Sequence, residues 1–375
     1  MYLNTLTVTN VRNLEDQAVL FDPFLNLISG ANGAGKTALL EAISLLARGR
    51  SFRTTRTDSV IRRGADSATV HGLVTGKSGQ KHRLGLAKTA SGKMQIVLDG
   101  DARQKISALA YQLPIHVLLP DASDLVLGPP SGRRAFIDWG LFHVEQDFLE
   151  VSRSYQRVLS QRNAWLKLQT SRKGGAIDSD VDPWRQQLLS YGTRLDELRL
   201  KYVERIGPFF AAALEALDAN AVIDLGYNSD GCRPGSSLSE ELARAWSRDL
   251  KFGTTHKGPH RADVSLLIEG RNAQTELSRG QVKLAVIALT IAQAEVLRVE
   301  RGQLGVFLID DLGAELDQKN LERLVDKLEE LRCQVIATST SDSLFNRAPG
   351  SRSIHSKLFH VEQGKVISAP ESENN

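Results

Sequence analysis

A run of glycines followed by a lysine and a threonine supplies the residue types that can hold a phosphate chain. It consists of Gly30, Ala31, Asn32, Gly33, Ala34, Gly35, Lys36 and Thr37, and it matches G-x-x-x-x-G-K-[ST] at every position. In such a loop the glycines let backbone N–H groups turn toward a β-phosphate, the lysine reaches the β- and γ-phosphates, and the threonine ligates Mg²⁺. The sequence therefore predicts that this loop binds ATP or GTP with Mg²⁺. The alternative is a glycine-rich turn before a helix.

Two adjacent acids supply the carboxylates that a phosphate loop needs. Asp310 and Asp311 follow the apolar strand expected at Val306–Ile309. In P-loop enzymes the first such acid sits near Mg²⁺ and the second can polarise the attacking water. We therefore expect Lys36, Asp310 and Asp311 to be catalytic, with Thr37 and Asp310 at the metal. A strand that ends in a solvated acidic turn is the alternative.

A third motif opens a later helix. Leu277-Ser278-Arg279-Gly280-Gln281 resembles the L-S-G-G-Q signature of ABC ATPases, with Arg279 in place of the first glycine, and Glu315-Leu316-Asp317 resembles their D-loop. In ABC proteins the signature faces the γ-phosphate bound by the opposite subunit. The resemblance therefore implies an ATP-dependent homodimer in which Ser278, Arg279, Gly280, Gln281 and Asp317 contact nucleotide. Ser278 as a plain helix N-cap is the alternative. ABC ATPases usually carry Glu where Asp311 stands, and the shorter side chain leads us to expect slow hydrolysis.

The elements that must position these motifs alternate in type along the chain. Strands are expected at Leu3–Val8, Ala18–Phe21, Phe24–Ile28, Val70–Val74, Met94–Leu98, Val222–Leu225, Val264–Ile268, Val306–Ile309 and Val335–Ala337, with turns at Gly76–Gly79 and Gly85. Helices are expected at Ala38–Ala47, Gln281–Leu297 and Gln318–Leu331, with two or more long ones between Arg133 and Leu217. This order predicts an α/β fold, an ABC-type (SMC/Rad50-like) P-loop ATPase head with an inserted helical arm domain.

The domain boundaries follow from the change in composition near Pro120. We expect residues 1–118 and 255–368 to form the head. Residues 119–254 are expected to form the helical arm, or signature-side domain, with the signature at 277–281 adjoining it. Residues 369–375 are polar and are expected to form a disordered tail.

The spacing of the motifs narrows the family. Ser278 follows Lys36 by 242 positions, more than a transporter subunit uses, and Thr338-Ser339-Thr340 stand where the switch histidine is usual. Asn32 is typical of SMC-like heads, but the chain has no room for their long coiled coils. The chain resembles the RecF family over nearly its whole length. Further motifs carry that resemblance: Val11-Arg12-Asn13, Gly49-Arg50-Ser51-Phe52-Arg53, Arg133-Arg134-Ala135-Phe136-Ile137-Asp138-Trp139-Gly140 and Gly258-Pro259-His260-Arg261.

The resemblance implies an ATP-dependent, DNA-binding recombination mediator with weak DNA-stimulated ATPase activity. Its cofactors would be ATP and Mg²⁺, and its partners double-stranded, gapped or single-stranded DNA, RecR and RecO. It would support DNA repair, replication and the SOS response. An ABC transporter ATP-binding subunit and an ATP-gated nuclease subunit are the alternatives. The long insertion counts against the first, and the lack of a second, acid-rich metal domain counts against the second.

A cluster of arginines follows the first helix, and its members from Arg50 to Arg63 are the expected DNA contacts. Its members are Arg48, Arg50, Arg53, Arg56, Arg62 and Arg63. Since no base-reading motif is present, we expect binding through the phosphate backbone. The alternative is a solvated or nucleotide-adjacent loop, with Arg12 and Arg50 serving the nucleotide. Arg133 and Arg134 are expected to anchor the arm helix.

Composition sets the remaining limits. The chain has 375 residues, 41% hydrophobic and 24% charged, with a formal net charge of +3. Cys232 and Cys333 lie far apart without neighbouring ligands, so neither a zinc site nor a disulfide framework is expected. Neither a signal peptide nor an apolar run of the roughly 20 residues that span a bilayer is evident. We expect a cytoplasmic protein that associates with the nucleoid through DNA and not with membranes.

Overall fold

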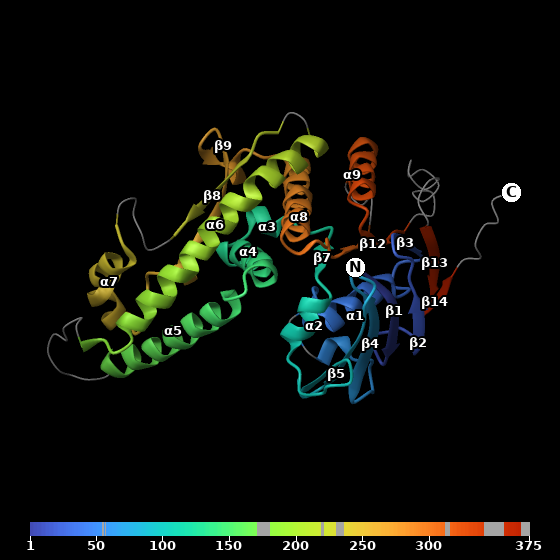
Figure 1. The fold of residues 1–375 in the computed structure, drawn as a ribbon, viewed down its shortest axis with the longest axis horizontal. Helices are drawn as coiled ribbons and strands as arrows, with labels where there is room; N and C mark the ends of the chain where they lie inside the picture. The colour runs from blue at the N-terminus through green and yellow to red at the C-terminus, as the bar shows by residue number, and fades with distance from the viewer. Residues whose placement is uncertain are drawn as a thin grey trace. The chain divides into compact units, whose positions relative to one another are not determined.

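The computed structural model describes residues 1–54, 56, 58–170, 181–218, 221–229, 236–311, 316–340 and 356–368. Contacts divide the chain into two compact units, and Figure 1 colours them along the sequence. Unit 1 comprises residues 1–122, 216–219 and 297–375, and unit 2 comprises residues 123–215 and 220–296. No helix of the described residues is long and apolar enough to span a bilayer.

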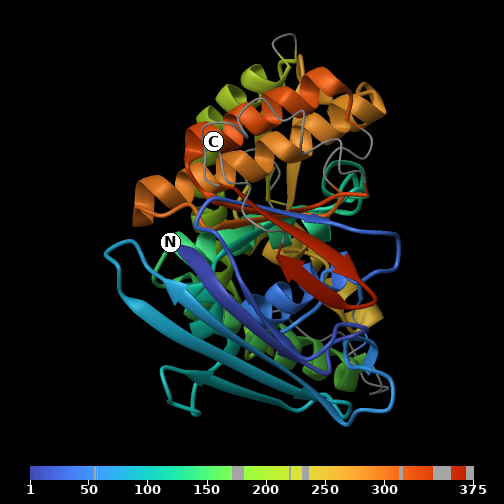
Figure 2. The ribbon, with the colours of Figure 1, turned by 90° about the vertical axis from the view of Figure 1, so that its right-hand side faces the viewer.

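Unit 1 contains an antiparallel sheet of five strands in the order β2-β1-β4-β5-β6 (Figure 2). The strands are β1 (Tyr2–Thr9), β2 (Gln17–Leu20), β4 (Ser67–Thr75), β5 (Lys81–Thr89) and β6 (Met94–Leu98). One face packs on the core, so Leu3, Leu6 and Val8 of β1 are buried. This alternation is the pattern expected of a half-buried antiparallel sheet.

A second sheet of unit 1 holds the chemistry. Its order is β14-β13-β3-β12-β11-β7, and all its pairs are parallel except β13–β14. The strands are β3 (Leu25–Ser29), β7 (Ile115–Leu118), β11 (Val306–Ile309), β12 (Gln334–Thr338), β13 (Ser356–Glu362) and β14 (Lys365–Ser368). The carboxyl ends of parallel strands meet at one edge, where open α/β sheets bind ligands.

Helices of unit 1 cover these sheets. They are α1 (Lys36–Arg48), α2 (Ile106–Gln112) and α9 (Gln318–Leu331), with a short 3₁₀ turn at Asp58–Val60. Helix α1 is buried nearly all round, because its apolar residues join the common core with β1, β4 and β11. Gly49 ends it in the left-handed region at φ 68°, where a glycine costs least. The phosphate loop is thus anchored on a rigid, buried helix.

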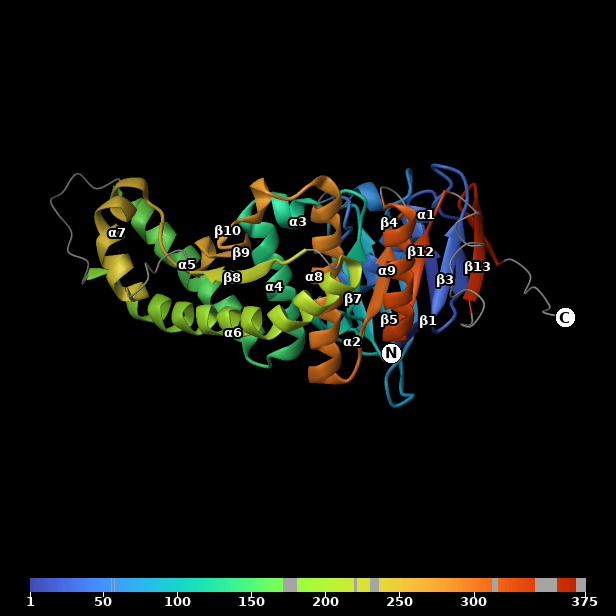
Figure 3. The ribbon, with the colours of Figure 1, turned by 90° about the horizontal axis from the view of Figure 1, so that it is seen from above.

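Unit 2 is mainly helical. Its helices are α3 (Asp124–Leu127), α4 (Pro130–Val144), α5 (Phe148–Thr170), α6 (Arg185–Leu217), α7 (Leu238–Phe252) and α8 (Arg279–Arg301), of which α6 and α8 run on into unit 1. Figure 3 shows α6 running along the length of this unit. Leu195, Leu198, Tyr202 and Ile206 give α6 a buried stripe at three- and four-residue spacing.

A small antiparallel sheet completes unit 2, in the order β10-β9-β8. Its strands are β8 (Asp224–Asn228), β9 (Asp263–Ile268) and β10 (Arg271–Asn272), with 3₁₀ turns at Pro259–Arg261 and Ala273–Thr275. Arg133 of α4 ties this sheet down, because its Nε and Nη2 donate to Asp263 at 2.7 and 2.9 Å. Arg134 donates to the Ala262 carbonyl at 2.6 Å. The prediction that both arginines anchor the arm helix is confirmed.

Three expectations about the fold differ from the structure. Residues 255–296 pack in unit 2 and not in the head, because β9 pairs with β8 and Asp263 binds Arg133. The first boundary lies at 122 and not at 118. Gly85 lies inside β5 and not in a turn, since the His71 ring covers the space where a Cβ would stand. The expected tail at 369–375 lies outside the described residues.

Candidate nucleotide-binding site

The phosphate loop lies between β3 and α1 at the carboxyl edge of the parallel sheet. Gly30, Gly33 and Gly35 have φ values of 142°, 79° and 123°, which L side chains rarely adopt. A Cβ on Gly30 would lie 2.3 Å from the Val361 carbonyl oxygen of β13. No side chain caps the N-terminus of α1, so its first N–H groups remain available to an anion.

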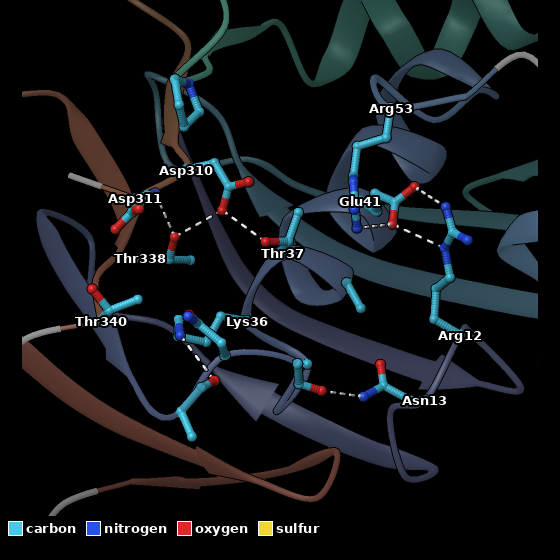
Figure 4. A pocket seen from close by; sticks show the side chains of 16 residues that line it. Arg12, Asn13, Lys36, Thr37, Glu41, Arg53, Asp310, Asp311, Thr338 and Thr340 are labelled. Atoms are coloured by element: carbon cyan, nitrogen blue, oxygen red, sulfur yellow. Dashed lines mark hydrogen bonds and ion pairs between the residues drawn. The ribbon is translucent and has the colours of Figure 1, made fainter. Parts of the chain in front are cut away.

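Lys36 points back into its own loop. Its Nζ donates to the carbonyls of Gly30 at 2.6 Å and Ala31 at 3.1 Å (Figure 4). Burial lowers the pKa of Lys36, and the nearby carboxylates of Asp311 and Asp310 partly offset that effect. A buried ammonium with two neutral acceptors and two nearby acids is suited to neutralising phosphate charge.

Three oxygens converge at the end of β11. The hydroxyls of Thr37 and Thr338 both donate to Oδ1 of Asp310, at 2.9 and 2.8 Å. Magnesium in proteins takes one or two carboxylates and completes its shell with substrate phosphates and water. Thr37 and Asp310 fit that chemistry and are the residues that would hold Mg²⁺. No group of three His, Cys, Asp or Glu side chains that could chelate a metal by itself occurs within the described ranges.

Asp311 follows in an unusual backbone conformation. Its φ is 55°, in the left-handed region that Asp tolerates better than most residues. Its N–H donates to the Thr338 hydroxyl at 2.8 Å, so β12 fixes the turn that presents its side chain to the pocket. Backbone strain of this kind clusters at functional sites.

These residues line a cavity of about 340 Å³. Its lining comprises Arg12, Asn13, Ala31, Asn32, Gly33, Gly35, Lys36, Thr37, Ala38, Glu41, Arg53, Pro120, Asp310, Asp311, Thr338 and Thr340. Figure 4 shows Thr37 and Asp310 joined by a hydrogen bond on one side of it, with Lys36 bonded to its own loop nearby. The structure therefore brings together the predicted loop, the acidic pair and Arg12.

Four polar lining residues were not predicted as site residues. Thr338 ends β12 and Thr340 follows it, where the switch histidine is usual, and Thr338 binds Asp310 directly. Asn13 donates to the Gly33 carbonyl at 3.0 Å and so holds the phosphate loop from the β1–β2 side. Glu41 lies one turn after Thr37 on α1, with a side chain only 1% exposed. A lone acid in an apolar helix was the available signal for it.

The signature motif lies in unit 2 and starts α8. The Ser278 N–H donates to Gln281 Oε1 at 3.0 Å, and the Gln281 N–H donates to Ser278 Oγ at 3.3 Å. This is a capping box, so the helix-cap alternative describes the contacts of the isolated chain. Ser278, Arg279 and Gly280 are exposed. Asp317 likewise caps α9 through the Asn320 N–H at 2.8 Å, and Glu315 of the expected D-loop lies outside the described residues.

The arginines of this cluster differ in their contacts and exposure. Arg48 donates to the Ile115 carbonyl of β7, and burial lowers its pKa to about 10, so it is structural. Arg62 donates to the Leu14 carbonyl and pairs with Asp16 at 2.8 Å. Arg53 lines the nucleotide cavity and lies 3.9 Å from Glu41. Arg50, Arg56 and Arg63 are exposed.

Three features define an ABC-type P-loop ATPase head. They are the phosphate loop after β3, the acidic pair after β11 and the serine-glycine helix start in unit 2. A family model described as the RecF/RecN/SMC N-terminal domain matches residues 2–366. The chain is 40% identical to the DNA replication and repair protein RecF of Pseudomonas syringae pv. syringae over 367 residues, covering 98% of each chain. It is 39% identical to that of Pseudomonas putida strain KT2440, with the same coverage. The chain therefore belongs to the RecF family.

Solved structures agree with this assignment. The recombination mediator protein RecF-ATP of the RecFOR pathway superposes with a TM-score of 0.86 at 26% identity, covering 98% of each chain. The Smc head bound to the C-terminal winged-helix domain of ScpA gives a TM-score of 0.59 at 16% identity, which supports the fold alone.

Proposed function

We propose that this chain is an ATP-dependent, DNA-binding recombination mediator that acts in DNA repair, replication and the SOS response. The observation that carries the proposal is the cavity formed by the phosphate loop, Lys36, Thr37 and Asp310 within a chain of the RecF family. The relatives are named for DNA replication and repair, and a solved relative is described as a RecF–ATP structure of the RecFOR pathway. A transporter subunit and a nuclease subunit are not favoured.

The nucleotide chemistry proposed is that of a slow ATPase. Magnesium held by Thr37 and Asp310 would supply positive charge that neutralises the charge developing on the phosphates in the transition state. Thr37 and Asp310 hold the metal side, Lys36 neutralises phosphate charge, and Asp311 orients the attacking water. DNA stimulates a turnover that stays weak, because the Asp311 carboxylate is one methylene shorter than the usual Glu. ATP serves mainly to favour one conformation over another.

The conformation that ATP favours is a homodimer. Ser278, Arg279, Gly280 and Gln281 of one copy contact the phosphates held by the other, with Asp317 beside them. Exposure of the motif in the isolated chain supports this proposal, since a contact made only in the dimer must be open in the monomer. Residues 1–122 and 297–368 then act as the nucleotide side and unit 2 as the signature side.

The proposed DNA surface consists of the arginines of residues 50–63. Arg50, Arg53, Arg56 and Arg63 are exposed, and Arg53 and Arg62 pair with Glu41 and Asp16. Each phosphate contact contributes about 0.9 to the slope of log affinity against log salt. Double-stranded and gapped DNA are the proposed ligands, with RecR and RecO as protein partners. The protein acts in the cytoplasm and associates with the nucleoid through DNA.

Light scattering with and without ATP tests the central part of this proposal. The wild-type mass should rise from 41.2 kDa toward twice that value when ATP is added. Ser278→Arg should stay monomeric, because a bulky cation would block the approach of the second copy. Ser237→Arg is the matched control, since Ser237 is also an exposed capping-box residue of unit 2, at the start of α7.

The control variant should dimerise like the wild type. A Ser278→Arg protein that still doubles its mass would place the dimer contact elsewhere. A dimer that ignores ATP would contradict the proposed role of the nucleotide.

A further inference from the structure

Glu41 is a buried carboxylate on α1 that accepts hydrogen bonds from several side chains. Its side chain is 1% exposed, and it accepts from Arg12 Nε at 3.0 Å and from Arg12 Nη2 at 2.7 Å. It also accepts from the Ser51 hydroxyl and pairs with Arg53 at 3.9 Å (Figure 4). A buried charge needs partners of this kind, because desolvation without them costs several kcal/mol or more.

The partners of Glu41 belong to two regions, the nucleotide cavity and the arginine-rich segment 50–63. Arg12 and Arg53 line the nucleotide cavity together with Lys36 and Thr37, and so does Glu41 itself. Ser51 and Arg53 belong to the segment 50–63, which carries the proposed DNA arginines. One carboxylate therefore touches both the nucleotide pocket and the start of that basic segment.

Hydrogen bonds continue from Glu41 into the basic segment. Ser51 Oγ accepts from the N–H groups of Arg53 at 2.9 Å and Thr54 at 3.2 Å. Thr54 Oγ1 then accepts from the Arg56 N–H at 3.0 Å, and the Arg56 carbonyl accepts from the Ser59 hydroxyl at 2.7 Å. Hydrogen bonds among the described residues thus lead from Glu41 through Ser51 and Thr54 to Arg56.

The far end of the segment is bonded to the backbone of Asn10 and Arg12. The Arg12 N–H donates to the Val60 carbonyl at 3.0 Å, and the Arg62 N–H donates to the Asn10 carbonyl at 2.8 Å. Arg12 thus holds Glu41 with its side chain and the end of the basic segment with its backbone. The start of the segment thus contacts Glu41, and its end contacts the backbone of Arg12, the residue whose side chain pairs with Glu41.

From this arrangement we propose that Glu41 is a positioning residue that couples ATP binding to DNA binding. The proposal rests on the proposed function, in which the cavity takes ATP and the basic segment takes DNA. Phosphates in the cavity attract Arg12 and Arg53 and repel the Glu41 carboxylate. Arg53 responds most, because it makes only a 3.9 Å ion pair with Glu41 and is 56% exposed. Its movement changes the turn at Ser51 and hence the display of the arginines beyond it.

The coupling is reciprocal. If ATP raises the affinity for DNA by some factor, DNA must raise the affinity for ATP by the same factor. Couplings between two sites typically amount to about 5- to 150-fold. The quantity to measure is therefore the ratio of the dissociation constants for duplex DNA without and with a non-hydrolysable ATP analogue.

Two variants remove different parts of the connection. Ser51→Ala removes the hydroxyl that joins Glu41 to the turn and leaves the Glu41–Arg12 pair intact, so the fold is retained. Glu41→Gln removes the charge that holds both arginines. Ser59→Ala is the matched control, since it deletes a hydroxyl of the same segment that bonds to Arg56 and not to Glu41. Arg63→Gln reports whether the segment binds DNA at all.

We expect a wild-type ratio of at least about five, retained in Ser59→Ala. The ratio should fall below about two in Ser51→Ala and Glu41→Gln, with the affinity of Ser51→Ala for ATP alone unchanged. A wild-type ratio near one, or a Ser51→Ala ratio equal to that of the wild type, would overturn the role of Glu41. If Arg63→Gln leaves DNA affinity and its salt slope unchanged while coupling persists, the basic segment is not the DNA surface. That outcome overturns the route from Glu41 to DNA, whereas ATP-dependent DNA binding itself stands.

Discussion

Two helices in this chain, α1 and α8, begin with glycines and a hydroxyl residue. They differ in whether side chains cap their first N–H groups. Helix α1 begins after Gly35 with no side-chain cap and faces a cavity. Helix α8 begins with a capping box in which Ser278 and Gln281 satisfy each other. An uncapped helix start is ready for an anion, whereas a capped one has local partners for its donors. The first can bind phosphate in a single chain, and the second must exchange partners to do so.

This contrast gives the two motifs different energetic roles. At α1 the glycines are required by the backbone, since φ at Gly35 is 123° and Leu14 and Val361 crowd the place of a Cβ. At α8 the space around Gly280 is open. Apart from its chain neighbours and the backbone of its own helix, no heavy atom of the described residues lies within 4 Å of the place that a Cβ would take. The α1 glycines therefore serve the fold as well as the ligand, whereas Gly280 serves no packing need within this chain.

Replacing Lys36 with Met should cause the largest loss among these variants, a loss of affinity for ATP. A small loss would contradict the conclusion that the start of α1 holds the phosphates in a single chain. The ammonium is held by two carbonyls inside the loop, so its loss removes charge-assisted bonds to phosphate worth about 3 kcal/mol. Affinity for ATP should fall by roughly 100-fold, measured with a fluorescent ATP analogue at equilibrium. Lys319→Met, at an exposed position of α9, is the control and should bind normally.

The sequence predicted the three central strands of the parallel sheet, β3, β12 and β11, because they are short, buried and followed by the phosphate loop, the acidic pair or polar residues, but it missed β7, β13 and β14. Val306–Ile309 and the helix Gln318–Leu331 agree with the structure at both ends. Strand β5 was missed because Gly85 suggests a turn, and only the packing of His71 from the neighbouring strand explains it. A single sequence does not reveal such cross-strand contacts.

The sequence likewise predicted some residues of the candidate site and missed others. Lys36 and Thr37 were predicted from the spacing of the phosphate loop, and Asp310 was predicted from its place directly after an apolar strand. Glu41 and Thr338 were not, because their importance comes from partners 10 to 29 positions away for Glu41 and 28 positions away for Thr338. Arg48 belongs to the same run of arginines in the sequence, and only the structure shows that it contacts β7.

Ser278→Ala should give an intermediate effect and sharpen the comparison. Losing an N-cap side chain costs about 1 kcal/mol, and the same cost is expected for Ser237→Ala at α7. Chemical denaturation should therefore show the two variants equally destabilised. Only Ser278→Ala should also lose ATP-dependent dimerisation. Equal dimerisation of both variants would mean that the Ser278 hydroxyl is a cap and nothing more.

Gly280→Ala should give the smallest change in stability, and of the opposite sign. Gly280 lies within α8 with open space around it, so alanine should stabilise the helix by about 0.5–1 kcal/mol. If a second copy brings phosphate against this backbone, the added methyl group should nevertheless weaken ATP-dependent dimerisation. Denaturation and light scattering on the same preparation would then move in opposite directions, which a purely structural glycine does not produce. A variant that is more stable and dimerises normally would show that no ligand approaches Gly280, and would leave α1 as the only one of these two helix starts that holds phosphate.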